Sequence, residues 1–597
     1  TGFYEKLPPS LIRKNNVTLF PEGAIGYLVG PTLALLANSV MANYFNKYMS
    51  DVLHINTWAK GFFTWLPVLS VIFVVIGNII VGKLMDNNVS KAGKARPLIL
   101  LSVPLSLIAL LFLFVFCPYN AANESWHTGA LVCIAIGYNL WFAFAYPMYY
   151  TPHAALVSLS TRNSKDRGLL ATISNATMLA AMGLSAMVLP FFLHLLFVYD
   201  MSGKGTPVTN DAGKIQYYVD ETGAAIYDAG TSQNHWKVFV IALIIITFVG
   251  VLIEYFFTRE RVTEETAGNE GNEKKALPTG EQAKICLHDK FWIIMMVFFF
   301  LYQFGGMIKN VSQNYFCTAM FPDAQGNYTV SYGGQLQGTL AIIGAIPTAI
   351  GMVIALPLAN KLGSKAKAIL CGAVVATIGG AIGMLAPSNW VVVIVSFVIK
   401  ALGSTPAMYL SLALLADILD HQEAINGSRT DGLSMTIYGA IIAGMTGLTT
   451  GVLNAVLSAV NYDISTLQTN TALRSAMPWV FIGGETLCYL GIFLVFLFMK
   501  VEKFGKLDHK AIVEDQKAAA KAEGRKYISA EEKIRIEEGE EAYQAELKKQ
   551  ADAAKAEEAR IAKLTDAQKK AEKEAEAKLL EEFNALRKAS NRPVIKA

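Results

Sequence analysis

Apolar runs long enough to cross a lipid bilayer set the strongest limit on what this chain can fold into. Trp236–Phe257, Trp390–Leu415 and Val480–Met499 each reach the roughly 20 residues that a transmembrane helix needs. Of the 597 residues, 53% are hydrophobic and only 16% are charged, which is too apolar for a soluble protein of this size. The sequence therefore predicts an all-α membrane protein.

Hydropathy divides the chain into about twelve such transmembrane helices. The expected spans are 24–49, 57–85, 97–118, 127–158, 168–198, 236–258, 287–319, 335–361, 366–387, 389–419, 432–462 and 476–500. The loops rich in Lys and Arg fall on one side of these spans, and the opposite loops hold few basic residues. Basic loops favour the cytoplasm, so we expect a multi-pass protein of the cell membrane with both termini cytoplasmic.

The two halves of the chain carry similar turns. The second span is followed by GKLMDNNVSKAGKARP and the eighth by PLANKLGSKAKA, both of them basic turns with small residues. This echo predicts two pseudo-symmetric six-helix bundles, which in secondary transporters enclose a substrate site near mid-membrane. The expected domains are an N-terminal cytoplasmic segment (1–23), a first bundle (24–258), a cytoplasmic linker (259–286), a second bundle (287–500) and a charged cytoplasmic tail (501–597).

Two parts of the chain are expected outside the membrane. The external loop 199–235 contains KIQYYVDETGAAIYDAG, whose alternating pattern around Glu-Thr-Gly predicts a β-hairpin, either a solubilising loop or a lid over the external mouth. In the tail, Ser529 with Glu532 and Thr565 with Gln568 are capping-box signatures that begin two helices. This helical tail is either solvated, docked on the cytoplasmic face where it regulates closure, or bound to a protein partner.

Three stretches together resemble the glycoside–pentoside–hexuronide:cation symporter family, the melibiose-permease branch of the major facilitator superfamily. They are GKLMDNNVSKAGKARP after span two, YTPHAALVSLSTRNSKDRGLL at the end of span four, and LADILDHQEAINGSRTDGL between spans ten and eleven. The resemblance covers residues 20–500 and leaves out the tail. It implies twelve helices in two bundles that rock about a central site, which opens to each side of the membrane in turn.

The resemblance also implies a cytoplasmic gate. Charged residues near the cytoplasmic ends of the spans would pair across the bundle interface when the inside closes, and separate when it opens. Each exposed pair contributes only roughly 0–1 kcal/mol, yet several together shift an equilibrium between states of similar energy. Basic-loop topology and ordinary helix ends explain any one of these residues equally well. The gate candidates are Asp86, Lys94, Arg96, Arg167, Asp417, Asp420, Glu423 and Arg429.

The positions that bind sodium in the family's sodium-coupled members have changed here. Those members carry two carboxylates one turn apart on span two, and the matching residues are Asn78 and Val74. The family's sugar-binding carboxylate falls at Tyr150, its span-five arginine at Asn175 and its span-eleven lysine at Ala443. One amide and one valine do not supply the several oxygen ligands that sodium needs, so we expect no sodium coupling through the usual site.

Few charges remain inside the expected spans, and an intramembrane charge is a functional-site candidate by default. Lys400 and Glu485 lie at similar depths on spans ten and twelve. They either pair, or Lys400 faces the cavity while Glu485 anchors its helix. His153 on span four is able to carry a proton near neutral pH, or else it is a packing residue. Together with Asn78, these three residues are the candidates for coupling.

The candidate substrate site is rich in aromatic and amide side chains. Aromatic faces stack against sugar rings and amides pair with hydroxyls in both directions, although such residues also serve in packing. Because the cavity has lost most of the family's charges, it suits a neutral glycoside. The candidates are Asn38, Asn139, Trp141, Tyr146, Tyr149, Tyr150, Asn175, Tyr302, Gln303, Lys400, Tyr409 and Tyr438.

The sequence thus predicts a secondary active transporter of a glycoside or related sugar-like solute. It would run as a proton symporter, an exchanger or a uniporter. One alternative keeps the fold but moves an apolar or lipid-like solute, and a second is a non-transporting sensor or scaffold that acts through its tail. No enzyme motif and no phosphate-cradling loop is present, and no cofactor or metal is expected. The net charge of +4 does not point to nucleic acid, so the partners are the solute, a coupling proton and the bilayer.

Overall fold

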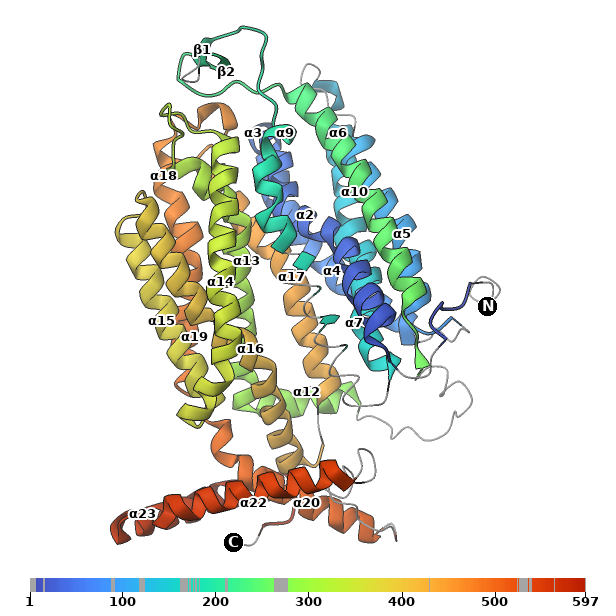
Figure 1. Cartoon of the computed structure of the whole chain (residues 1–597), viewed down its shortest axis with the longest axis vertical. Helices are drawn as coiled ribbons and strands as arrows, with labels where there is room; N and C mark the ends of the chain where they lie inside the picture. The colour runs from blue at the N-terminus through green and yellow to red at the C-terminus, as the bar shows by residue number, and fades with distance from the viewer. Residues whose placement is uncertain are drawn as a thin grey trace.

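The computed structural model is a helical protein with a small hairpin at one end and a layer of helices at the other (Figure 1). It describes residues 7–13, 17–86, 92–117, 124–161, 170, 173–174, 177, 180–181, 183–209, 213–261, 278–428, 430–522, 524, 535, 540–562 and 564–595. We call the end with the hairpin the hairpin side, and the end covered by the C-terminal helices the tail side.

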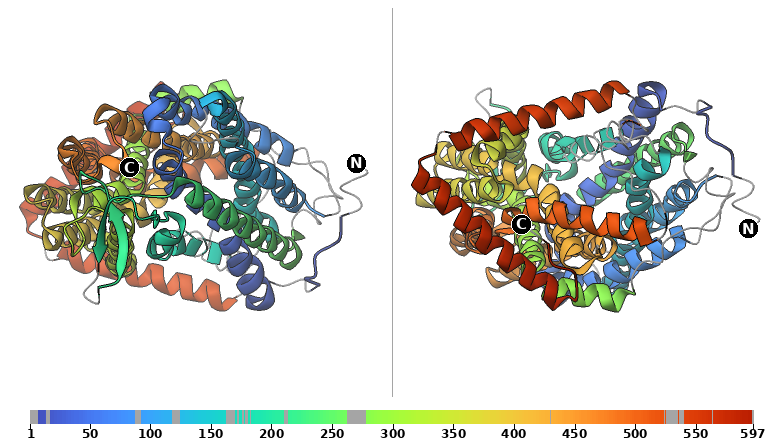
Figure 2. Two further views of the ribbon diagram at one scale, coloured as in Figure 1. Left: turned by 90° about the horizontal axis from the view of Figure 1, so that it is seen from above. Right: turned by 90° about the horizontal axis from the view of Figure 1, so that it is seen from below.

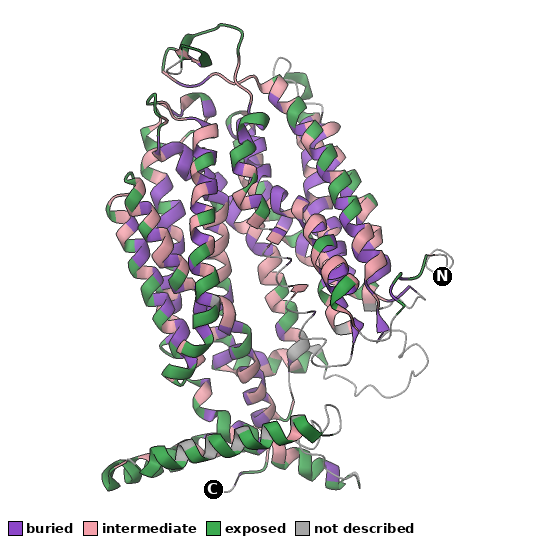
Figure 3. Cartoon of the chain, viewed as in Figure 1, coloured by how far each residue is buried: buried purple, intermediate pink, exposed green. Residues whose placement is uncertain are grey.

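The N half forms one group of helices. Its elements are η1 (Leu19–Val29), α2 (Gly30–Asp51), α3 (Ile55–Trp58), α4 (Lys60–Asp86), α5 (Arg96–Leu110), η2 (Leu111–Val115), η3 (Glu124–Trp126), α6 (His127–Asn139), η4 (Leu140–Ala145), α7 (Tyr146–Ser160), η5 (Leu189–Phe192), α9 (Leu193–Leu196) and α10 (Ala229–Phe257). Large apolar side chains such as Ile72, Phe73 and Val238 are exposed on these helices, as expected for surfaces that face lipid. Figure 3 shows the buried residues gathered inside the two helix groups and the exposed ones on their outer faces and along the tail.

The C half forms the second group. Its elements are α12 (Thr279–His288), α13 (Lys290–Met320), α14 (Val330–Leu362), α15 (Lys365–Leu385), α16 (Trp390–Asn426), α17 (Asp431–Ala459), η6 (Ile464–Thr466), α18 (Thr471–Pro478), η7 (Trp479–Gly483) and α19 (Gly484–Phe496). Figure 1 shows α12 lying across the tail side rather than along the bundle.

Within the described residues, ten helices are long and apolar enough to cross a membrane, or eleven when the two parts of the bent α14 count as one span. Eleven of the predicted spans overlap these helices. The remaining one, 168–198, is described over 183–198 and at a few positions before that, and it includes η5 and α9. The all-α membrane architecture expected from hydropathy is therefore present.

The two halves share a capping device at equivalent places. Glu260, just after α10, accepts hydrogen bonds from the backbone N–H groups of Ala95 and Arg96 at 3.0 and 2.9 Å, where α5 begins. Glu502, just after α19, accepts from Lys365 N at 2.8 Å and Ala366 N at 3.0 Å, where α15 begins. A carboxylate at a helix N-terminus satisfies otherwise unpaired N–H groups and favours the positive end of the helix dipole. Each half therefore ties its last span to its third.

The hairpin predicted in the loop 199–235 is present, but one of its strands differs from the prediction. β1 (Thr206–Thr209) pairs antiparallel with β2 (Ile215–Val219). We expected β2 to pair with the segment after the Glu-Thr-Gly turn, but that segment forms a single bridge to β2, between Val219 and Ala225, and another to Tyr199 through Tyr227. The turn closes instead through Asp220, whose side chain accepts hydrogen bonds from the Thr222 and Ala224 N–H groups, so the chain bends back without forming a second ladder.

The N half and the C half meet on the hairpin side and separate toward the tail side (Figure 1). Four glycines of α17 show that this helix moves away from α4 toward the tail side. A Cβ atom on Gly451 would lie 2.1 Å from Val68, one on Gly447 2.4 Å from the Pro67 carbonyl, and one on Gly444 3.1 Å from Val71. At Gly439, nearer the tail side, nothing would lie within 4 Å. Close approach of α4 and α17 therefore requires glycine only on the hairpin side.

The C-terminal tail consists of η8 (Val501–Phe504), α20 (Gly505–Ala522), α22 (Glu540–Ala562) and α23 (Asp566–Ala589). Seen from below, these helices lie across the tail side of the molecule (Figure 2). The predicted capping box at Thr565 and Gln568 is confirmed at the start of α23, and the one at Ser529 and Glu532 lies outside the described residues.

The tail docks on the end of α16, and docking was one of the three alternatives that the sequence left open for it. His421 on α16 contacts the Asp508 carboxylate at 2.8 Å, and both side chains are buried. The His421 ring stacks on Phe504, with centroids 4.9 Å apart, and Phe583 of α23 packs against the same pair. Arg587 of α23, which is 1% exposed, donates to the carbonyl of Ala424. A shared apolar core and charged contacts therefore hold the tail on the C half.

We predict that Arg587→Gln releases α23 from the end of α16. Arg587 also forms an ion pair with Asp515 of α20 at 2.9 Å, so its loss removes hydrogen bonds to a charged group that contribute about 2 kcal/mol, or roughly thirtyfold in the docking equilibrium. Limited proteolysis of the intact protein should then cleave the tail faster. The matched control is Arg560→Gln, because Arg560 forms an exposed pair with Glu572. Equal cleavage rates for the two variants would contradict this docking contact.

Candidate functional site

A buried ion pair lies where the two halves meet on the hairpin side. Lys47 and Asp51, one turn apart on α2, contact each other at 2.7 Å, with side chains 1% and 0% exposed. Both halves contribute to their surroundings, because the Tyr462 hydroxyl donates to Asp51 at 2.9 Å and the Tyr315 hydroxyl bonds Ser50 at 2.9 Å. These contacts hold the hairpin side closed in this structure.

Lys47 and Asp51 were not predicted as functional residues from the sequence. Two opposite charges four residues apart in an apolar segment were the signal that could have found them. Two further contacts join α4 to the C half near this pair. Lys60 donates to Asn461 at 2.6 Å, and Asn454 donates to the Phe63 carbonyl at 2.6 Å.

Inside the C half, the predicted charges Lys400 and Glu485 form an ion pair at 2.6 Å, both 3% exposed. Of the two alternatives left open by the sequence, pairing is therefore the one observed. A third member was not predicted: Lys309 of α13 contacts the other oxygen of Glu485 at 3.1 Å and remains 25% exposed. Two lysines therefore share one glutamate within the membrane span.

In the N half, His153 of α7 has a partner that the sequence reading did not identify. Its Nδ1 lies 2.6 Å from Oε1 of Glu254 on α10, and the two side chains are 3% and 0% exposed. The Tyr149 hydroxyl donates to the second oxygen of Glu254 at 2.5 Å, and Ser174 lies 3.3 Å from His153 Nε2. Glu254 is the acidic residue near the end of an otherwise apolar span, and that position was the available signal.

The span-four candidates divide into two sets. Tyr146 and Tyr150 are partly exposed and stack with ring centroids 5.4 Å apart, while Tyr149 is buried against Glu254. Among the described residues, Asn139 Oδ1 and Trp141 Nε1 are buried polar atoms without a hydrogen-bond partner. Such atoms are costly to leave unpaired, so they suit a polar ligand or water.

Two of the C-half candidates lie within electrostatic reach of a third. Tyr302 of α13 lies close enough to Tyr409 of α16 and Tyr438 of α17 to interact with them electrostatically, and all three are partly exposed. Tyr438 is in similar reach of Tyr150 of the N half. The structure thereby brings predicted residues of both halves together at the level where α4 and α17 separate. Gln303 is partly exposed on the same turn of α13.

The remaining substrate and coupling candidates lie on the N half. Asn78 donates to the carbonyl of Val74 on its own helix at 2.8 Å, so its amide is turned to the backbone. Asn38 has a buried Oδ1 with no hydrogen-bond partner in the described part of the chain. Asn175 lies outside the described residues. Within the described ranges, no group of three His, Cys, Asp or Glu residues is placed to hold a metal ion.

Two of the described gate candidates, Arg96 and Asp417, make contacts within their own halves. Arg96 donates to the Tyr255 carbonyl and stacks on the Tyr255 ring, while Lys94 is partly buried beside it. Asp417 pairs with Lys365. Asp420 and Glu423 are partly buried on α16. The side chains of Asp86, Arg167 and Arg429 lie outside the described residues.

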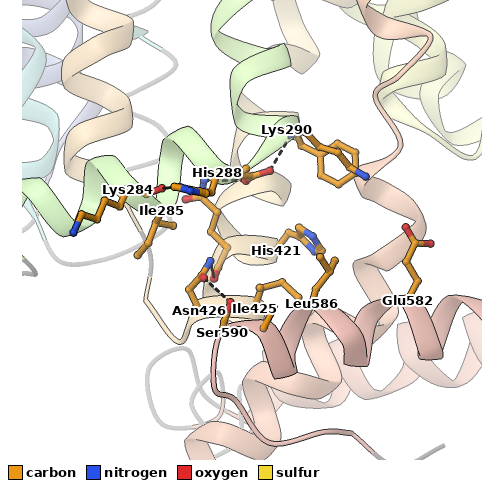
Figure 4. A pocket seen from close by; sticks show the side chains of 14 residues that line it. Lys284, Ile285, His288, Lys290, His421, Ile425, Asn426, Glu582, Leu586 and Ser590 are labelled. Atoms are coloured by element: carbon orange, nitrogen blue, oxygen red, sulfur yellow. Dashed lines mark hydrogen bonds between the residues drawn. The ribbon is translucent and has the colours of Figure 1, made fainter.

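A separate cavity lies on the tail side, between α12, the end of α16 and α23 (Figure 4). It has a volume of about 490 Å³, and its lining includes Lys284, His421, Asn426, Leu586 and Ser590. Ser590 donates to Asn426 at 3.0 Å across its floor. None of the predicted substrate residues lines it, so it is distinct from the tyrosine cluster between the halves.

Comparison with known proteins gives consistent matches. The model of the family described as MFS/sugar transport protein matches residues 26–503. An uncharacterized symporter of Bacillus subtilis (strain 168), YnaJ, is 24% identical over 496 residues, which are 81% of this chain and 92% of that protein. The isoprimeverose transporter of Lactiplantibacillus pentosus is also 24% identical, over 511 residues, which are 83% of this chain and 91% of that protein.

A solved structure of the xylose transporter XylE from E. coli is 13% identical, with a TM-score of 0.48, and the match covers 81% of this chain and 98% of that one. The family match spans both helix groups and reaches from η1 to η8. The chain is therefore a multi-pass membrane transporter rather than an enzyme, and it belongs to the MFS/sugar transport protein family.

Proposed function

We propose that the chain moves a glycoside or related sugar-like solute across the cell membrane by alternating access, with its tail side and both termini in the cytoplasm. The observation that carries this proposal is the tyrosine cluster between the halves. Tyr146 and Tyr150 come from the N half and Tyr302, Tyr409 and Tyr438 from the C half. A solute bound there touches both halves, so its binding is coupled to their relative position.

The chemistry of this cluster fits a neutral sugar. Aromatic faces stack on the apolar faces of sugar rings, and phenol hydroxyls donate and accept hydrogen bonds. Elsewhere in the N half, Asn38, Asn139 and Trp141 hold one donor and two acceptors without a hydrogen-bond partner among the described residues. The relative described as an isoprimeverose transporter supports the same class of solute.

The proposed cycle opens the hairpin side as the tail side closes. In the structure the halves are joined on the hairpin side by the contacts around Lys47 and Asp51, and these must separate for that side to open. The ion pair itself lies within α2, so it survives the opening and moves from a buried site into water, where a charged pair is tolerated. The gate candidates on the tail side would then come together.

Coupling to sodium is not part of the proposal. Sodium is a hard cation that requires several oxygen ligands. The two positions that would supply carboxylates are Val74, which has none, and Asn78, whose amide nitrogen is bonded to the helix backbone.

We therefore predict saturable uptake of neutral glycosides into proteoliposomes that contain the purified chain. Uptake should be unchanged when sodium is replaced by potassium at constant pH. A panel of labelled neutral sugars, anionic sugars and lipids, each measured with and without protein, tests the solute class. Uptake of lipids alone, or its collapse when sodium is removed, would contradict the proposal.

A second prediction concerns Tyr150. Tyr150→Ala removes the stacking face and should raise KM for the sugar roughly tenfold, whereas Tyr150→Phe keeps the ring and should change KM little. Tyr218→Ala, in the hairpin, is the control for loss of a tyrosine elsewhere. Equal KM values for Tyr150→Ala and the unaltered protein would remove Tyr150 from the site.

A third prediction tests the alternating movement. Gly451→Val places a side chain against Val68, so the hairpin side should open; Gly439→Val fits the open space beside it and should leave that side closed. Spin labels on Thr57 and Ser465, exposed residues of the two halves, measure the separation. The Gly451 variant should show the longer distance. Equal distances in both variants would argue against movement at this contact.

A further inference from the structure

We propose that His153, Glu254 and Tyr149 form the proton-binding site of this transporter. The site joins α7 to α10, in the tail-side part of the N half, and it shares no residue with the Asn78 and Val74 positions of α4. This inference rests on the proposed transport function and adds to it the identity and place of the coupling ion.

The first argument is burial. His153 and Glu254 are 3% and 0% exposed, and their facing atoms are 2.6 Å apart. With one shared proton the pair has no net charge, either as imidazolium with carboxylate or as imidazole with carboxylic acid. Without that proton, Glu254 is a buried anion assisted only by the Tyr149 hydroxyl. A buried charge without a counter-charge is strongly unfavourable.

The second argument is the surroundings of the pair. In the described part of the chain, no lysine or arginine forms an ion pair with Glu254. Two arginines of the N half have other partners: Arg261 pairs with Glu22 at 2.8 Å, and Arg96 donates to the Tyr255 carbonyl at 3.0 Å. His153 is therefore the partner whose protonation can neutralise Glu254.

The other elements packed around the pair contribute neutral groups. On α7, Tyr149 donates to Glu254, and the Tyr150 ring lies 6.4 Å from His153. Ser174 of span five faces Nε2 of His153, and the buried Tyr27 of η1 lies within electrostatic reach of Glu254. Glu260, the remaining nearby acid, is held by backbone N–H groups at the start of α5. Among the residues that the structure describes, no lysine or arginine forms an ion pair with Glu254.

The third argument is the connection to the solute. His153 stacks on Tyr149, with ring centroids 5.7 Å apart and planes 9° apart, and lies one turn from Tyr150 of the tyrosine cluster. A solute that displaces Tyr150 therefore acts on the helix that carries His153. The pair can pass through a closed, dehydrated state when it holds its proton, but the unprotonated pair requires water. This difference makes movement of the halves depend on the proton.

The proton balance is simple. A proton from water on one side adds to the imidazole of His153 and is shared along the Nδ1–Oε1 contact with Glu254. After the halves have moved, the same proton leaves to water on the other side, and no other group changes its bonds. One proton crosses with each solute.

The transport test uses Glu254→Gln in the full chain reconstituted in proteoliposomes. Glutamine is a neutral stand-in for protonated glutamate, so labelled-sugar counterflow, which needs no net proton movement, should stay within about twofold. Accumulation driven by an imposed pH gradient should fall at least about tenfold, because no proton is released. Glu260→Gln, a change at a neighbouring buried acid, should keep both activities.

A second measurement needs no sugar. Infrared difference spectra of the purified chain between about pH 5 and about pH 8 should contain imidazole and carboxyl bands that disappear together in Glu254→Gln and in His153→Gln. Retention of these bands in either variant would overturn the proton site, as would gradient-driven accumulation by Glu254→Gln. Wild-type counterflow without gradient-driven accumulation would overturn the proton site but leave sugar transport standing. Absence of counterflow for every sugar would overturn the proposed function. In that case the infrared result by itself would decide whether the proton site exists.

Discussion

The closure of the hairpin side is the constraint on which the rest of this structure depends. Lys47 and Asp51 are withdrawn from water there, and the Tyr462 hydroxyl of the other half donates to Asp51. Because such a pair is costly to bury without full hydrogen bonding, the two halves are held in one register rather than sliding freely. The glycines of α17 let α4 approach on that side, and the divergence beyond them leaves the tyrosine cluster partly exposed.

Hydropathy was sufficient to predict the helices, because a membrane span is a property of one continuous segment. The pairing of Lys400 with Glu485 was also within reach, since each is a charge at a definite depth in its own span. Lys309 and Glu254 were missed although they lie in predicted spans, because one charge hardly alters the average of a long apolar window. Their roles follow from partners that are distant in sequence, and periodicity carries no information about those partners.

The C-terminal tail also shows what composition does not reveal. Its composition, rich in Ala, Glu and Lys, predicts a solvated helix, and most of α22 is exposed as that composition suggests. Its docking depends on a few residues that composition hides, among them Phe583 and the buried Arg587. Likewise, the hairpin was predicted from alternation, but its strand partner was not, because register depends on turn geometry as well as on the pattern.

The carboxylates of Glu260 and Glu502 have a consequence beyond helix capping. In each half, this contact fixes the chain just after the last span to the start of the third span. A force on the following segment therefore acts on this contact before it reaches the interior of the bundle. One exit leads to the connector between the halves and the other to the C-terminal extension. A segment that begins after Glu502 therefore leaves both capped helix ends unchanged, and the chain's own C-terminal extension begins at that point.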